Sequence, residues 1–184
     1  MTVTALGRWR GPIESDLERA RRGDQQAFTD IVNQHEAMVF SIALHAIGKR
    51  EIAEEIAQEV FLQLYRSLDR IGSDEHLTNW LRRTATHRTL DYCRTRSKAS
   101  FTAIDSVPEP SVEHFEPDPL LGDLLRKHLR ALPSAHRMIV VLRFGEQMKL
   151  KEIAASLDMP LNTVKTNLRR ALTRLRELIG NEER

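Results

Sequence analysis

Apolar residues recur at helical spacing along both halves of the chain, and this pattern predicts an all-α protein. Valine and isoleucine are scattered rather than alternating, and no Asn-Gly or Asp-Gly pair marks a hairpin. The spacing predicts four helices in the N-terminal half, over residues 15–22, 27–47, 51–68 and 78–96, with a loop at 71–77. It predicts four more in the C-terminal half, over residues 120–131, 133–144, 149–157 and 161–179.

Short local signals set the ends of the first helices. Ser15-x-x-Glu18 has the arrangement of a capping box, Gly23-Asp24 breaks the first helix, and Gly48 ends the second. Aromatic residues on these helices are interpreted as packing residues rather than base-stacking platforms; they are Phe61, Tyr65 and Trp80. The other residues expected to face inward are Ala27, Ile31, Met38, Ile42, Ile47, Ile52, Ile56, Val60, Leu64, Leu81, Ala85, Leu90, Val164, Leu168, Leu175, and either Ala171 or Leu172.

Proline divides the chain into two bundles. Four of the seven prolines fall at Pro108, Pro110, Pro117 and Pro119, where each removes a backbone donor and disfavours helix. Acids and serines surround them, so residues 99–119 are predicted to be an extended, flexible, solvated linker. The predicted domains are therefore residues 15–98 and 120–180, two small helical bundles.

The composition is that of a globular chain, with 41% hydrophobic and 29% charged residues. No apolar run approaches the roughly 18 residues that cross a bilayer, and the N-terminus lacks the apolar stretch of a secretory signal. The one cysteine, Cys93, has no partner for an internal disulfide and is interpreted as a small helical residue. We therefore expect a cytoplasmic protein without membrane insertion.

Charge is informative through its distribution rather than its sum, which is only +2. Arginine and lysine dominate residues 82–98 and 165–176, whereas residues 105–123 carry acids and no base. Two basic stretches that flank an acidic spacer indicate two surfaces for a polyanion.

The segment LKEIAASLDMPLNTVKTNLRRAL, residues 150–172, has the pattern of a helix-turn-helix. Asp158-Met159-Pro160 stops one helix, and Pro160 suits the start of the next. Such turns often carry glycine at the place of Asp158, and aspartate tolerates the left-handed conformation better than most residues. The major groove admits one helix, which presents its outward side chains to base edges and phosphates. Those predicted to face outward are Asn162, Thr163, Lys165, Thr166, Asn167, Arg169 and Arg170, with Arg174 and Arg176 extending the basic face.

Three segments resemble the sigma-70 family of bacterial transcription initiation factors, most closely its extracytoplasmic-function (ECF) group. Leu132-Pro133, VVLRF at 140–144 and KEIAASLDMPLNTVKTNLRRALTRLREL at 151–178 resemble its promoter-binding fourth domain. REIAEEIAQEVFLQLYRSLDR at 50–70 and NWLRRTATHRTLDYCRTR at 79–96 resemble its second domain. The resemblance spans roughly residues 15–180 and lacks the first and third sigma domains, as ECF members do.

The resemblance implies bacterial core RNA polymerase and promoter DNA as partners, and it implies a site for each. Glu55, Gln58 and Glu59 would bind the polymerase clamp, and Gln63 and Arg66 would extend that patch. The helix-turn-helix residues would contact the duplex −35 element. An anti-sigma factor is a further partner found in this family. The residues placed at the single-stranded −10 element are Ser73, Asp74, Glu75, His76, Arg82, Arg83, His87, Arg88, Arg94 and Arg96.

Three positions depart from the family pattern. Leu77 replaces a frequent aromatic residue, His87 a frequent asparagine, and Asn167 a frequent arginine. These departures leave the preferred −10 and −35 base sequences open.

Signals of catalysis are missing from the sequence. No Gly-rich phosphate loop, nucleophile elbow or His-Glu-x-x-His motif occurs, and the histidines are dispersed. We expect no enzymatic activity, no cofactor and no metal. Two alternatives remain at this point: a stand-alone helix-turn-helix regulator, which would not need the Glu55, Gln58 and Glu59 face, and a protein-interaction bundle, which would not need the basic helix.

Overall fold

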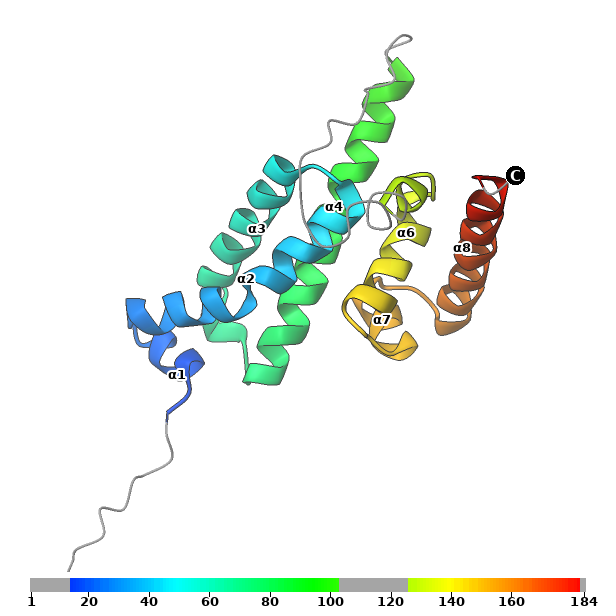
Figure 1. Cartoon of the computed structure of the whole chain (residues 1–184). Helices are drawn as coiled ribbons and strands as arrows, with labels where there is room; N and C mark the ends of the chain where they lie inside the picture. The colour runs from blue at the N-terminus through cyan, green and yellow to red at the C-terminus, as the bar shows by residue number, and fades with distance from the viewer. Residues whose placement is uncertain (1–13, 103–125, 183–184) are drawn as a thin grey trace, which may run out of the picture.

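The computed structural model describes residues 14–102 and 126–182, and it describes side chains at 14–95 and 126–180. Most of the predicted linker, residues 103–119, lies outside the described residues, as does the N-terminal segment 1–13. All regular structure in the described residues is helical, so the all-α prediction is confirmed. Figure 1 shows the helices in chain order from blue to red.

The first bundle is built from helices that lie close to their predicted positions. Helix α2 ends at Gly48, which adopts the left-handed conformation at φ 77° that glycine tolerates. Ile56, Val60 and Leu64 line the inner face of α3 as the spacing predicted. The elements are α1 (Asp16–Arg21), α2 (Gln25–Ile47), α3 (Arg50–Tyr65), the 3₁₀ turn η1 (Leu68–Arg70) and α4 (Asp74–Thr102).

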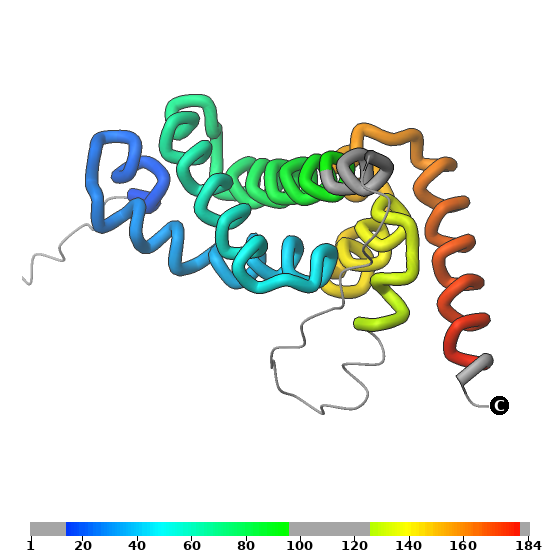
Figure 2. The backbone as a smooth tube through the Cα atoms, turned by 90° about the horizontal axis from the view of Figure 1, so that it is seen from above, coloured from blue at the N-terminus to red at the C-terminus, as the bar shows by residue number. Residues whose placement is uncertain are grey.

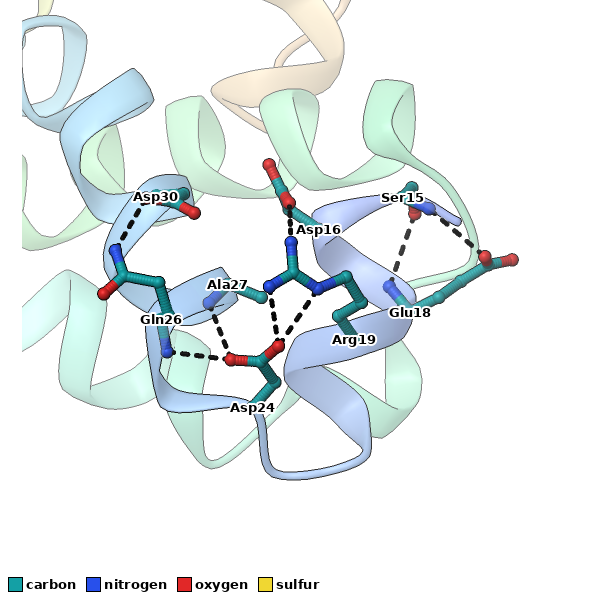
Figure 3. A network of polar contacts seen from close by, with 8 residues as sticks. All are labelled: Ser15, Asp16, Glu18, Arg19, Asp24, Gln26, Ala27 and Asp30. Carbon is teal, nitrogen blue, oxygen red and sulfur yellow. Dashed lines mark hydrogen bonds and ion pairs between the residues drawn. The ribbon is translucent and has the colours of Figure 1, made fainter. Parts of the chain in front are cut away.

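Polar side chains hold the start of this bundle together (Figure 3). The capping box is confirmed. The Glu18 N–H donates to Ser15 Oγ and the Ser15 N–H donates to the Glu18 carboxylate, each with a donor–acceptor distance of 3.3 Å. Asp24 accepts the N–H groups of Gln26 and Ala27 at the N-terminus of α2, and the Arg19 guanidinium at 2.7 Å. One aspartate therefore caps α2 and ties it to α1.

The second bundle contains the predicted helix-turn-helix. Residues 126–130 are helical. The predicted helix 133–144 is divided, because a π-helical turn follows its first two turns and the Glu146 N–H bonds to the Val141 carbonyl five residues back, at 3.1 Å. Ala171, and not Leu172, is the buried residue of the last helix. The elements are α6 (Ser134–Val140), the π turn η2 (Val141–Gly145), α7 (Leu150–Ser156) and α8 (Leu161–Glu182).

Another difference concerns the loop predicted at 71–77, because α4 already begins at Asp74. The Ser73 hydroxyl accepts the His76 N–H at 3.2 Å, as an N-cap does, and two acids fill the first turn, where they complement the helix dipole. Leu77 is consequently a buried helix residue. At its other end α4 continues to Thr102 rather than stopping at Arg96.

The two bundles pack against each other in this structure, which the sequence pattern did not predict. Helix α2 contacts α6 and η2, and helix α4 contacts α6 and α7. Val39 and Ile42 of α2 belong to the same buried apolar cluster as Met138, Leu142 and Ile153 of the second bundle. Helix α8 lies at the edge of the molecule remote from α1 in both views (Figures 1 and 2).

Replacing Asp24 with asparagine is expected to lower the thermal midpoint of the chain near neutral pH and to change it little in acid. The Ala27 N–H, followed by the Arg19 guanidinium, holds the pKa of the Asp24 carboxyl below its usual range. The folded-state pKa is depressed, so the stabilisation is present above the unfolded-state pKa and is lost as the pH falls through the folded-state pKa.

Thermal unfolding followed by circular dichroism across that pH range measures this difference. Asp69→Asn, at an exposed aspartate of η1, is the control for the loss of one carboxylate. A gap between wild type and Asp24→Asn that stays constant into acid would contradict the assignment.

Candidate nucleic-acid interfaces and an exposed helical face

The turn between α7 and α8 has the predicted left-handed residue. Asp158 adopts φ 51°, a conformation that aspartate tolerates better than most residues. The Pro160 carbonyl accepts the Val164 N–H at 3.1 Å, which starts α8 in the place expected for a helix-opening proline. Val164, Ala171 and Leu175 anchor the inner face of α8 in the protein. Helices α7 and α8 therefore form the helix-turn-helix.

The predicted −35 residues lie on the first three turns of α8. Asn162, Thr163 and Lys165 are exposed, as are Arg169 and Arg170, while Thr166 and Asn167 are half-buried. Farther along, Arg174 pairs with Glu177 at 3.1 Å. The structure thus brings donors for phosphates and base edges together on one helix.

A polar groove lies between α4 and α7. Arg83, His87 and Arg88 line it from α4, together with His76 and part of Trp80. Trp80 also packs against the apolar core, which agrees with its interpretation as a packing residue. Four of the predicted −10 residues are therefore brought together here. The α7 side of the groove consists of Glu152, Ala155, Ser156 and Asp158.

The remaining predicted −10 residues do not line the groove, and His76 has a structural contact in addition to its place there. Ser73 and His76 stabilise the start of α4, since His76 Nδ1 accepts the Gly72 N–H at 2.9 Å while Ser73 caps the helix. Arg82 does not line the groove; it is half-buried, and its Nε atom is buried without a hydrogen-bond partner among the described groups. Arg94 pairs with Asp91 at 3.1 Å, and Asp74 and Glu75 are exposed. The Arg96 side chain lies outside the described residues.

The predicted polymerase-binding residues lie on the outer side of α3. Glu55 and Glu59 are exposed there. Gln58 lines a groove between α2 and α3, whereas Glu59 lies 3.8 Å from Arg88 of α4. Arg88 also donates to Gln63 at 3.1 Å. The α3 face is therefore linked to the helix that carries the polar groove.

Apolar side chains, among them Phe28, Val32 and Phe40, line much of the groove between α2 and α3, and sequence reasoning missed this groove. Leu62 is 58% exposed and Tyr65 61% exposed beside it, so the prediction that Tyr65 is a core residue is wrong, while Phe61 is buried as predicted. The Tyr65 ring meets the Phe28 ring edge to face with centroids 5.2 Å apart. The helical period does not distinguish the two aromatics, because each follows directly after a buried residue of the inward stripe. They differ in that Tyr65 is the last residue of α3.

Partial burial disfavours the charged forms of two histidines and of the cysteine. Burial lowers the pKa values of His35 and His45, and a nearby arginine lowers each further. Burial also raises the pKa of the Cys93 thiol, which opposes formation of a reactive thiolate. Within residues 14–102 and 126–182, no three of the histidine, cysteine and acidic side chains form a group suited to a metal ion.

Two family models match the chain in the order of its two bundles. Sigma-70 region 2 matches residues 31–99, and sigma-70 region 4 matches residues 128–177. The chain is a sigma factor of the sigma-70 family. Such a factor directs promoter-specific transcription initiation by RNA polymerase, so both alternatives left open by the sequence give way to this function.

Curated relatives of this sigma factor belong to the ECF group. The chain is 28% identical over 182 residues to the ECF RNA polymerase sigma factor SigW of Bacillus subtilis, covering 90% of this chain and 95% of the relative. It is 33% identical over 169 residues to SigE of Mycolicibacterium smegmatis, covering 86% and 65%. The ECF RNA polymerase sigma-E factor of Escherichia coli K12 is 28% identical over 182 residues, covering 90% and 91%.

Solved structures share the fold of this sigma factor. The sigma factor RpoE of Bartonella quintana, in complex with the anti-sigma factor NepR, aligns with a TM-score of 0.66 and 21% identity over 84% of this chain and 98% of that one. CnrH in complex with the cytosolic domain of CnrY gives 0.66 and 22% over 90% and 96%. Among the described residues, no helix has the length and apolar character needed to span a membrane.

Truncating the two aromatic residues of α3 is expected to have unequal costs. Phe61→Ala should lower the free energy of unfolding by about 3–5 kcal/mol, because it empties a buried ring site. Tyr65→Ala should cost no more than about 1 kcal/mol, mostly from the edge contact with Phe28. Urea unfolding of the full chain measures both values, and equal losses would contradict the exposed position of Tyr65.

Proposed function

We propose that this sigma factor assigns its three tasks to three separate surfaces. The exposed face of α3 binds core RNA polymerase, the polar groove of α4 holds the single-stranded −10 element, and the outer face of α8 reads the duplex −35 element. The observation that carries the proposal is the separation itself: the three predicted residue sets lie on different helices. Different substitutions can therefore remove one task without the others.

The proposed −35 contact rests on the helix-turn-helix geometry and on charge. Helix α8 exposes Lys165, Arg169 and Arg170, and these can neutralise phosphates. Asn162 and Thr163 lie in its first turn, the part of a recognition helix that reaches base edges. Affinity for the −35 duplex should accordingly fall with salt, while Asn162 and Thr163 contribute to base choice.

The proposed −10 contact rests on the donors of the α4 groove. A sigma factor that opens DNA without ATP must stabilise the unpaired strand, and each flipped base costs a few kcal/mol. Arg83 and Arg88 provide charge for the strand's phosphates, and Trp80 presents a partly exposed ring next to them. We include Arg82 only through its position on the same helix, because its side chain does not line the groove.

The proposed polymerase contact extends beyond the three predicted residues. Glu55, Gln58 and Glu59 offer acceptors to basic side chains, and exposed Leu62 and Tyr65 add apolar area next to them. An interface with apolar anchors and a charged rim is the usual composition of a protein docking site. The three predicted residues would then form the polar rim of this site.

The same proposal covers location, partners and chemistry. The protein acts in the cytoplasm, where bacterial polymerase and promoters are, and it works without catalysis, cofactor or metal. The two solved structures with the same fold are complexes with the anti-sigma factor NepR and with the CnrY cytosolic domain. We therefore propose that an anti-sigma protein also regulates this factor.

Run-off transcription with purified core polymerase on genomic fragments tests the proposed function. Initiation should occur on a subset of fragments, and only when this protein is added. Protein that fails to associate with core polymerase, or that leaves transcription unchanged, would refute the proposal.

The double substitution Lys165→Ala and Arg170→Ala is expected to weaken binding to a −35 duplex about 10- to 100-fold while leaving polymerase affinity unchanged. For each phosphate that the protein no longer neutralises, the slope of log affinity against log salt should become shallower by about 0.9. Fluorescence anisotropy on a labelled duplex at several salt concentrations measures both quantities.

The double substitution Gln58→Ala and Glu59→Ala is expected to do the reverse, because it alters only the outer side of α3. Polymerase affinity should fall about tenfold or more in a competition assay, and duplex affinity should stay the same. Each pair serves as the control for the other. If both pairs caused the same loss in both assays, the division of tasks would be incorrect.

A further inference from the structure

The helix-turn-helix turn is hydrogen-bonded to the α4 groove. Arg83 Nη2 donates to both carboxylate oxygens of Asp158, at 2.8 and 2.9 Å. His87 Nε2 lies 2.9 Å from the Ser156 carbonyl oxygen and 3.5 Å from the Asp158 carboxylate. Because a carbonyl only accepts, His87 Nε2 must be the donor. Two of the groove's proposed strand-binding side chains are thus bound to the other bundle.

We infer that the turn carrying Ser156 and Asp158 occupies the −10 groove and blocks single-stranded DNA from it. We call this arrangement, in which the two bundles pack together, the closed chain. The inference rests on the proposed −10 role of Arg83 and His87. The outer faces of α3 and α8 stay exposed in the same structure, so closure masks one of the three surfaces and leaves the other two available.

The chemistry of the contact imitates that of a nucleic-acid strand. Both oxygens of the Asp158 carboxylate accept from one guanidinium nitrogen of Arg83, and a DNA phosphate would accept from the same donor. The Ser156 carbonyl offers His87 an acceptor of the kind found on a base edge. DNA and the turn therefore compete for the same donor atoms, and only one of them can be bound at a time.

The identity of residue 158 supports a role beyond the turn. At φ 51° glycine would be conformationally easier, and turns of this motif often carry it. Glycine would complete the turn but would leave Arg83 without a carboxylate. The aspartate thus accepts a less favourable backbone conformation and supplies the contact to α4.

Contacts outside the groove also stabilise the closed arrangement. Arg130 donates to the Gly48 carbonyl at 3.0 Å, and Arg137 donates to the Ala46 carbonyl, so two arginines of the second bundle bind the C-terminal end of α2. Buried apolar residues of both bundles also pack together in one core. The Asp158 contact is therefore a latch at one edge of a larger interface, and its removal should shift closure rather than abolish it.

Glu146 offers a substitution that acts in the opposite direction. Its carboxylate accepts the Ser41 hydroxyl of α2 at 3.2 Å, across the same interface. Burial raises the pKa of Glu146, although Ser41 and then Arg82 lower it in part, so the closed chain disfavours the charged form. Glutamine keeps an acceptor for Ser41 without the buried charge, and Glu146→Gln should favour closure.

The test compares two acid-to-amide substitutions in the full chain, with spin labels at Asn33→Cys on α2 and Gly180→Cys on α8 in a Cys93→Ser background. Gly180 has open space around an added Cβ atom, and Asn33 is exposed. Electron–electron double resonance should show mainly one closed-state distance. Asp158→Asn should move population to longer distances, Glu146→Gln should reduce any longer component, and Asp16→Asn on α1 should match the parent.

Binding supplies the second readout. The probe is a single-stranded oligonucleotide with the −10 segment of a promoter found by run-off transcription, and a −35 duplex is the reference. Asp158→Asn should bind the single strand about two- to fivefold more tightly, and Glu146→Gln should bind it more weakly. A matching gain on the duplex would show that Asp158→Asn acts only by removing negative charge, which would overturn the inference.

Further variants separate the inference from the proposed function beneath it. If Arg83→Ala in the Asp158→Asn background leaves single-strand affinity unchanged, the −10 role of the groove is wrong, and masking is wrong with it. If Arg83→Ala weakens binding there, but Asp158→Asn changes neither affinity nor distances, the −10 role stands and the latch is refuted.

Discussion

Helix α4 packs into the core of the first bundle on one side and faces α7 of the second bundle on another. The arrangement of both bundles depends on this constraint. Leu77, Leu81 and Ala85 are buried at four-residue intervals, so one side of the helix is committed to the core. Arg83 and His87 lie four residues apart on a different side, facing α7. Because successive residues turn by about 100°, these two sets cannot exchange places without unpacking the core. The groove is therefore oriented by the same contacts that fold the first bundle.

Arginine residues have two distinct roles in this sigma factor, and for this reason the net charge of the protein says little about DNA binding. Several guanidinium groups donate to backbone carbonyls at the ends of helices and turns: Arg21 to Leu68, Arg130 to Gly48, and Arg143 to Met148. A planar group with several donors suits carbonyl oxygens at such ends, whether they are unpaired or, like that of Leu68, already accept one backbone N–H. The exposed cations of α8 are a separate set, so position and not number defines the DNA-binding surface.

The sequence was sufficient to predict those features of the fold that depend on local structure. The capping box at Ser15, the end of α2 at Gly48 and the left-handed Asp158 follow from single-residue preferences that act within one turn. Long-range geometry was not accessible in this way. The packing of the bundles places Asp158 beside Arg83, 75 residues away, and no periodic signal encodes such a pair. Tyr65 was misplaced for a related reason, since the groove beside it exists only once α2 and α3 pack.

The interface between the bundles combines two kinds of contact with different consequences. Apolar burial supplies attraction but little orientation, because it is non-directional. Hydrogen bonds and ion pairs at the solvent-exposed edge supply little net stability, commonly about 0–1 kcal/mol for an exposed pair, but they specify which faces meet. Arg83 and Asp158 are both about half exposed, so their pairing belongs to the second kind. A single residue of the turn can therefore bias which surface is covered without being required for either bundle to fold.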